Sequence, residues 1–128
     1  MNIQNNYSVN PDKTVGAELR YIEGRGIYIP AIDKVLAMKD SYEGKAVTFD
    51  KAGKAPSIEE WRTILLYREE INRLLIENGG EPLEQGIYWS RTPDIETRGC
   101  AWYVYLDNGG TSDGSRYDLI YVRAVSAL

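Results

Sequence analysis

The sequence contains no histidine and a single cysteine, Cys100, among its 128 residues. Without histidine, the chain lacks the commonest general base and the commonest ligand of transition metals. One cysteine cannot form a disulfide within the chain, and a catalytic thiol at Cys100 would need an activating partner other than histidine. These absences argue against a zinc site, a histidine-dependent nucleophile and a fold held together by disulfides.

Long apolar runs are also missing. No stretch approaches the length of a membrane-spanning helix, and residues 1–6 lack the basic and apolar regions of a signal peptide. We therefore expect a chain that is not exported by that route, or one whose leader has been removed. The net charge is −4 and the basic residues are scattered, which argues against a nucleic-acid partner. The 43% hydrophobic and 27% charged content is typical of one soluble globular domain.

The first residues differ in character from the rest of the chain. Residues 1–15 are polar and show no apolar periodicity, and Asn10-Pro11-Asp12 is typical of a turn. We interpret residues 1–15 as a polar N-terminal arm that becomes ordered against a neighbour. Residues 16–128 then form a single domain.

A long helix is predicted from Ser57 to about Asn78. Ser57-Ile58-Glu59-Glu60 follows Pro56 and has the pattern of a capping box, in which the Ser57 hydroxyl and the Glu60 carboxylate satisfy backbone amides. Apolar side chains then recur at spacings of three and four and form one stripe, which comprises Ile58, Trp61, Ile64, Leu65, Ile71, Leu74 and Leu75. Gly79-Gly80 supplies the left-handed stop.

Short strands are predicted on both sides of this helix. Before it, Glu23-Gly24-Arg25-Gly26 has the glycine content of a hairpin loop between two β-prone runs. After it, residues 102–106 alternate, with Trp102 expected to be buried between sheet and helix, and Asn108-Gly109 is typical of a tight reversal. Residues 119–125 are apolar on both faces, which predicts a central strand. This order predicts an α+β fold with antiparallel sheets, one long helix and long C-terminal loops.

Few residues suggest catalysis or metal binding. Asp107, Asp113 and Asp118 lie close in sequence near Asn108, and three carboxylates there could hold a calcium ion. Their spacing is not that of an EF-hand, however, and glycine-rich loops use aspartate for turns in any case. The paired glutamates of the helix are explained by its cap and its solvated face. We therefore expect no enzyme activity, no cofactor and no metal ion.

Two polar segments between aromatic strands are better candidates for function. Residues 91–98 and 111–118 are interpreted as long loops on a rigid sheet, where binding residues concentrate. Plain solvated connections are the alternative. The candidate ligand-binding residues are Arg91, Asp94, Glu96, Arg98, Ser115, Arg116, Tyr117 and Asp118.

Several spaced motifs together suggest a family. They are Lys54-Ala55-Pro56-Ser57-Ile58-Glu59-Glu60-Trp61, Glu70-Ile71-Asn72, Gly79-Gly80, Gly86-Ile87-Tyr88-Trp89-Ser90, Ala101-Trp102-Tyr103-Val104, Asn108-Gly109 and the run from Tyr121 to Leu128. In this order they resemble the bacterial and phage C-type-lectin-like domains related to the C-terminal domain of Legionella collagen-like adhesin. These domains are abundant in Bacteroidetes and their phages and are similar to the variable proteins of diversity-generating retroelements. The resemblance covers residues 54–128 well and residues 17–53 only loosely.

The chain also departs from that family. Phe49 to Lys54 leaves room for barely a turn where such domains usually carry a first helix, and Arg91 follows Trp89-Ser90 where a second serine is usual. The calcium motifs of animal lectins, Glu-Pro-Asn and Trp-Asn-Asp, are missing as well. Calcium-dependent sugar binding is therefore not implied. Formylglycine-generating enzymes, which share the fold broadly, need more than one cysteine.

The resemblance implies a non-enzymatic module that binds a protein or a glycan on a cell surface through its C-terminal loops. The family context favours a phage virion component, such as a fibre, decoration or receptor-binding subunit, in a homo-oligomer or larger assembly. Two alternatives stay open: a purely structural virion subunit whose loops make subunit contacts, and a bacterial surface adhesin domain at the cell surface after leader removal. No nucleic acid and no membrane insertion are expected.

Overall fold

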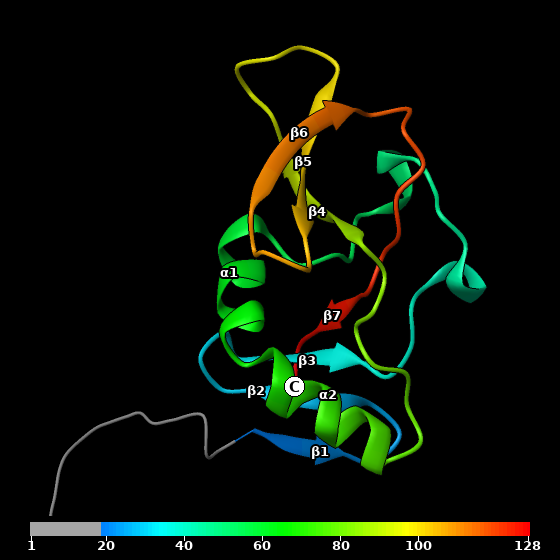
Figure 1. Cartoon of the computed structure of the whole chain (residues 1–128), viewed down its shortest axis with the longest axis vertical. Helices are drawn as coiled ribbons and strands as arrows, with labels where there is room; N and C mark the ends of the chain where they lie inside the picture. The colour runs from blue at the N-terminus through cyan, green and yellow to red at the C-terminus, as the bar shows by residue number, and fades with distance from the viewer. Residues whose placement is uncertain (1–18) are drawn as a thin grey trace, which may run out of the picture.

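The computed structural model describes residues 19–128, which form an α+β fold with two antiparallel sheets and two helices (Figure 1). The four-stranded sheet has the order β1-β2-β3-β7, and its strands are β1 (Arg20–Ile22), β2 (Gly26–Ile29), β3 (Lys34–Ala37) and β7 (Val125–Ser126). The three-stranded sheet has the order β4-β5-β6, and its strands are β4 (Ile87–Pro93), β5 (Cys100–Tyr105) and β6 (Thr111–Ser115). The predicted arm, residues 1–15, lies outside the described residues.

Two short 3₁₀ turns lie between β3 and the helices. They are η2 (Tyr42–Gly44) and η3 (Phe49–Lys51). The second is a single short turn and lies where the sequence leaves room for barely a turn, between Phe49 and Lys54. The predicted hairpin around residues 23–26 is also confirmed, because β1 and β2 pair there with Ile22 opposite Gly26.

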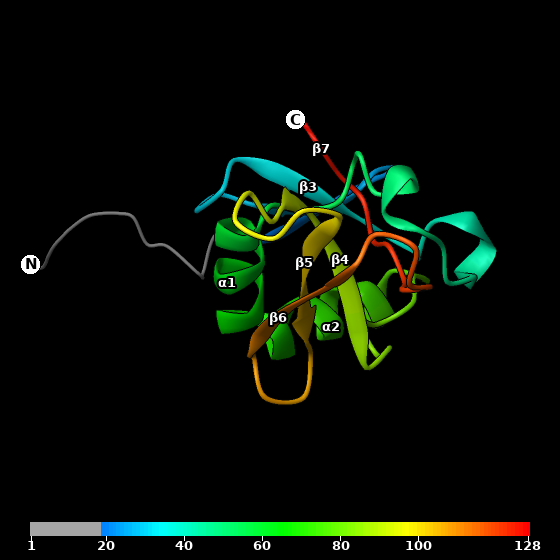
Figure 2. The same ribbon diagram turned by 90° about the horizontal axis from the view of Figure 1, so that it is seen from above.

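The expectation of one long helix is wrong. The helical region is divided into α1 (Ile58–Leu66) and α2 (Arg68–Glu77), and Tyr67 between them has a non-helical backbone with φ −109° and ψ 19°. The division follows from packing, since α1 contacts β4 and β5 whereas α2 contacts β1 and β2. A straight helix could not follow both sheets. In the view from above, α1 lies at the left edge of the domain and α2 lies behind the strands of the three-stranded sheet (Figure 2).

The start and stop signals of this helical region are confirmed. The Ser57 hydroxyl accepts a hydrogen bond from the Glu60 N–H at 3.1 Å, and the Glu60 carboxylate accepts one from the Ser57 N–H at 2.9 Å. Gly79, just after α2, has a φ of 82°. Because this left-handed conformation suits glycine, Gly79 ends the helix as predicted.

The C-terminal run is not the central strand that its pattern predicts. Of residues 119–126, only Val125 and Ser126 form a strand, at the edge of the four-stranded sheet. The preceding residues pass between the two sheets and hydrogen-bond to several segments in turn: Ile120 to Val47, Tyr121 to Trp89 and Val122 to Ser41. Ile120, Val122 and Val125 are buried because these different segments cover them, whereas Leu119 at the start of the run is exposed.

Residues 111–118 are not one long loop. Thr111–Ser115 form β6, which pairs with β5 from Val104 opposite Thr111 to Cys100 opposite Ser115. The β4–β5 connection is correspondingly short, because β4 continues to Pro93 and β5 begins at Cys100. The expectation of long C-terminal loops is therefore wrong for residues 91–93 and 111–115.

The core consists of two adjacent apolar clusters. The larger is centred on Trp61 and the faces of both helices, and the smaller is centred on Trp89. The predicted alternation along β5 holds, since Val104 and Leu106 are buried and Tyr105 is exposed. Trp102 packs against the larger cluster but is only half-buried, which corrects its expected full burial. None of the helices within residues 19–128 is long and apolar enough to cross a membrane.

Candidate recognition surface and neighbouring cavities

Two of the predicted binding segments meet at one end of the three-stranded sheet. The connection of residues 94–99 and the turn of residues 116–118 lie side by side, because the Arg116 N–H donates to the Gly99 carbonyl at 3.0 Å. Cys100 and Ser115, which adjoin the two segments, are paired on the adjacent strands β5 and β6. This pairing holds the two segments side by side. In Figure 1 this end is uppermost, with the yellow connection beside the end of β6. We refer to residues 94–99 and 115–119 as the terminal surface.

Asp94 holds the shape of the first segment. Its Oδ1 accepts hydrogen bonds from the N–H groups of Glu96 at 2.9 Å and Thr97 at 3.2 Å, and its own N–H donates to the Cys100 carbonyl at 3.1 Å. A hydrogen bond from the Asp113 carboxyl and the N–H of Glu96 lower the pKa of Asp94, while the Asp94 carboxyl raises the pKa of Asp113. Asp94 is buried and is engaged within its own turn.

Arg91 is engaged in a similar way, away from the terminal surface. Its guanidinium contacts the Glu60 carboxylate at 2.8 Å and the Ala55 carbonyl at 3.0 Å. Glu60 also contacts the Lys34 ammonium group at 2.7 Å. Burial would raise the pKa of Glu60, but the hydrogen bonds from Arg91, Lys34 and the Ser57 N–H lower it to about 2. Arg91 therefore ties β4 to the start of α1.

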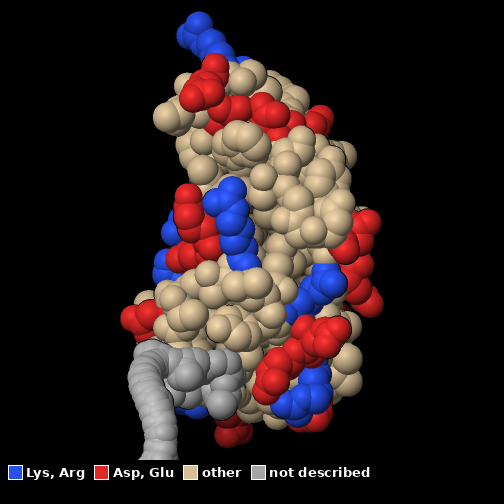
Figure 3. All heavy atoms as spheres, turned by 60° about the vertical axis from the view of Figure 1, so that its left-hand side comes forward, with Lys and Arg blue, Asp and Glu red and all other residues tan. Residues whose placement is uncertain are grey.

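The remaining candidates are exposed on the terminal surface: Glu96, Arg98, Ser115, Arg116, Tyr117 and Asp118. The same two segments also carry exposed apolar and aromatic side chains. Ile95 is 91% exposed and Leu119 is 67% exposed, beside Tyr117 at 84%. Figure 3 shows charged side chains gathered at this end, with acidic atoms around it and a basic side chain projecting beyond it. Ile95 could have been identified from the sequence, because it is the one large aliphatic residue within the polar connection of residues 94–99.

The outer face of β5 and β6 adjoins this surface. The rings of Tyr103 and Tyr105 meet edge to face with centroids 5.5 Å apart, and their hydroxyl oxygens are 3.4 Å apart. The Tyr105 hydroxyl raises the pKa of Tyr103. A Cβ at Gly114 would lie 2.9 Å from the Tyr103 ring and from the Asp118 carboxylate. The glycine thus lets Tyr103 and Asp118 approach each other closely.

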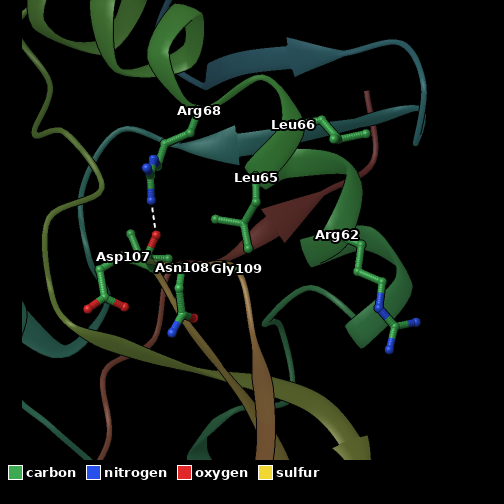
Figure 4. A pocket seen from close by; sticks show the side chains of 8 residues that line it. Arg62, Leu65, Leu66, Arg68, Asp107, Asn108 and Gly109 are labelled. Carbon is green, nitrogen blue, oxygen red and sulfur yellow. Dashed lines mark hydrogen bonds between the residues drawn. The ribbon is translucent and has the colours of Figure 1, made fainter.

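A cleft opens at the opposite end of the sheet, between the helix junction and the β5–β6 hairpin (Figure 4). It has a volume of about 360 Å³ and is lined by Arg62, Leu65, Leu66, Arg68, Leu106, Asp107, Asn108 and Gly109. The Arg68 guanidinium reaches across it to the Leu106 carbonyl, Leu65 points toward the hairpin, and Leu66 points away. The lining contains one carboxylate, that of Asp107, so the cleft does not offer the paired carboxylates of acid–base catalysis.

The three aspartates considered for calcium are not brought together. Asp107 lines the cleft, just after the last residue of β5. Asp118 follows the last residue of β6, at the opposite end of the β5–β6 pair. Asp113 lies within β6, opposite Trp102. Within residues 19–128, no group of three potential metal-ligating carboxylate, thiol or imidazole side chains is close enough to hold an ion. Cys100 is half-buried at the start of β5.

Comparison with known proteins finds no family model and no curated relative that matches this chain.

Proposed function

We propose that the protein is a non-enzymatic recognition module that binds a protein or a glycan through the terminal surface. The observation that carries this proposal is the exposure of Ile95 and Tyr117, at 91% and 84%, in segments that also carry exposed charged side chains. Exposed apolar side chains are common singly, but apolar anchors within a polar rim are the usual composition of a binding surface. Ile95 and Tyr117 would be the anchors.

The framework behind these anchors is rigid, which favours binding. Asp94 caps the turn that carries Ile95, and the Ser115 hydroxyl accepts a hydrogen bond from the Tyr117 N–H at 3.1 Å. Because both segments are already ordered, a ligand would not have to pay for ordering them. Arg98 and Glu96 would contribute charge selectivity at the rim.

The fold and its context extend the proposal. A C-type-lectin-like domain is compatible with the two antiparallel sheets and two helices. In the proposed setting, the domain is a virion fibre, decoration or receptor-binding subunit and is present in several copies. A small polar surface binds weakly in isolation, and linked copies gain about 10²–10⁴ in avidity. A purely structural virion subunit and a bacterial surface adhesin domain are the competing proposals.

A matched pair of variants tests this function. Ile95→Ser with Tyr117→Ser removes both proposed anchors, while Leu66→Ser with Ile76→Ser removes two exposed apolar side chains of α1 and α2. Each protein would be screened on immobilised glycans and on fixed Bacteroidetes cells. We expect the first variant to lose binding and the second to retain it. Binding that survives the first variant would overturn the proposal, and so would loss in the second. A wild-type protein that binds neither panel but forms large assemblies would favour the structural subunit.

A further inference from the structure

We propose a second binding site, for a monosaccharide-sized oxyanion, in a pocket that shares no residue with the terminal surface. The pocket has a volume of about 260 Å³ and is lined by Ser41, Tyr42, Asp50, Lys51, Gly53, Lys54, Val122 and Ala124. Pockets for drug-sized ligands range from about 300 to 1,000 Å³. The volume therefore suits a small ligand, such as one sugar ring with an acidic substituent.

The pocket is built from three segments that are distant in sequence and joined by hydrogen bonds. The Ser41 N–H donates to the Val122 carbonyl at 2.8 Å, and the Tyr42 hydroxyl donates to the Lys51 carbonyl at 2.7 Å. The Val125 N–H donates to the Lys54 carbonyl, also at 2.8 Å. These bonds fix the walls before any ligand arrives, so binding would require little reorganisation.

The charge of the pocket favours an anion. Lys51 and Lys54 are exposed, and neither forms an ion pair with another residue in the described range 19–128. By contrast, Lys34, Arg91 and Arg123 each contact a carboxylate. Two lysines without an ion-pair partner are a local source of positive charge in a protein of net charge −4.

The remaining charge in the lining does not neutralise the lysines. Asp50 accepts a hydrogen bond from the Thr48 hydroxyl and forms no ion pair with another described residue. The charged residues of the lining are therefore two lysines and one aspartate, which together carry a net positive charge. An incoming carboxylate or phosphate would balance the remaining positive charge.

The other wall residues indicate that the ligand has an organic part. Ala124, which is half-buried, supplies aliphatic surface, and Tyr42 supplies an aromatic ring that stays 46% exposed. Tyr42 and Glu43 both have a φ of 57°, a left-handed conformation that is costly for residues other than glycine. Backbone strain of this kind persists where the surroundings enforce it. The hydrogen bond from the Tyr42 hydroxyl to the Lys51 carbonyl keeps the ring beside the pocket. A ring stacked on Tyr42 with its acid group toward the lysines would use both features.

Binding would be tested by titrating the full chain, labelled with ¹⁵N, at constant ionic strength. The probes are glucuronate, glucose 6-phosphate, glucose and inorganic phosphate, and the reporters are the amide signals of Ser41 and Gly53. We expect glucuronate or glucose 6-phosphate to shift these signals and to bind more tightly than glucose and inorganic phosphate. The two charged probes distinguish a carboxylated sugar from a phosphorylated one.

Variants then assign the site. Lys51→Gln with Lys54→Gln should weaken binding about tenfold, because two exposed ion pairs are lost. Lys45→Gln removes an exposed lysine outside the lining and should leave binding unchanged. The proposal is overturned if no probe shifts Ser41 and Gly53, if inorganic phosphate or glucose binds as tightly as the charged sugars, or if the double variant binds normally. None of these results depends on Ile95 or Tyr117, so the two proposals can fail separately.

Discussion

The Nε of Arg123 lies 2.7 Å from Oδ1 of Asp40, and the Arg123 side chain is completely buried. The same guanidinium donates to the carbonyls of Ala37 at 3.1 Å, Glu81 at 2.8 Å and Pro82 at 3.0 Å. The Tyr88 hydroxyl donates to the same Asp40 oxygen at 2.8 Å. One arginine therefore joins β3, the segment after α2 and the C-terminal run, and Asp40 neutralises its charge.

Replacing Asp40 should be one of the most destabilising single changes in the protein. Asp40→Ala leaves the Arg123 charge buried without a partner and should lower the free energy of unfolding by about 3–5 kcal/mol. Tyr88→Phe removes one hydrogen bond to the carboxylate and should cost about 1.5–3 kcal/mol. Urea denaturation of both variants checks this order. An Asp40→Ala protein as stable as Tyr88→Phe would show that the ion pair is not needed for stability.

Glu60 should make the free energy of unfolding depend on pH. Its pKa is lowered in the folded protein to about 2 from an ordinary value of 4.5, so its contribution is complete above pH 4.5 and is lost as the pH falls toward 2. The Glu60→Gln variant lacks this contribution. The stability difference between wild type and variant should therefore be constant above pH 5 and shrink below about pH 4.5. Chemical denaturation at a series of pH values measures it, and an equal difference at pH 3 and pH 6 would contradict the assigned contacts.

Two glycines should respond very differently to alanine. A Cβ at Gly26, whose φ is 150°, would lie 1.9 Å from the Leu36 carbonyl oxygen on the paired strand. Gly26→Ala should therefore lower stability by at least about 1–3 kcal/mol, the usual range for overpacking. Gly53 has no heavy atom within 4 Å of the added carbon and serves as the control. Its substitution should change stability by no more than about 0.5 kcal/mol in a thermal melt. Equal losses would contradict the β2–β3 pairing.

The aromatic side chains provide a further test of the core. Trp61 is fully buried and its Nε1 donates to the Trp89 carbonyl at 3.0 Å, so Trp61→Ala should cost about 3–5 kcal/mol. Trp102→Ala should lower the free energy of unfolding by less than Trp61→Ala does, because Trp102 is only half-buried. Tyr117→Ala should lower it by less than about 0.5 kcal/mol, because Tyr117 is exposed. Denaturant midpoints would rank the three. A different order would indicate that α1 does not cover β4 and β5 as described.

Stability should not depend on a metal ion. The motifs of calcium-binding lectins are missing from the sequence, and Asp107, Asp113 and Asp118 are spread along the sheet. Melting temperatures with and without a chelator are expected to coincide. Since a ligand that binds only the folded state raises the melting temperature, a higher value without chelator would reveal a structural ion.

Local features were predictable from the sequence because their causes lie within a few residues. The Ser57–Glu60 capping box, the stop at Gly79 and the β1–β2 hairpin all depend on adjacent side chains. The break at Tyr67 was not predictable, since neither glycine nor proline marks it and the cause is the packing of α1 and α2 on different sheets.

The candidate site was predictable only in part for the same reason. The polar segments that meet at the terminal surface could be identified from composition. Composition does not reveal that Arg91 and Asp94 are engaged within the fold. Arg91 contacts Glu60 and Ala55, and Asp94 binds amides of its own turn at residues 94–97. The buried Arg123 shows most clearly that such contacts cannot be predicted from neighbouring residues, because its partner Asp40 is 83 positions away.

The path of residues 120–126 has a consequence for how the chain folds. Hairpin pairings such as β1–β2 connect neighbours in sequence and can form early. By contrast, Val125 completes the first sheet by pairing with Leu36, and Tyr121 bridges to Tyr88 of the second. Closing such long loops costs chain entropy before any contact compensates for it, which slows folding. During synthesis, the first sheet therefore keeps an unpaired β3 edge until residues 120–126 emerge, so the domain cannot complete its pairing before that segment has been made.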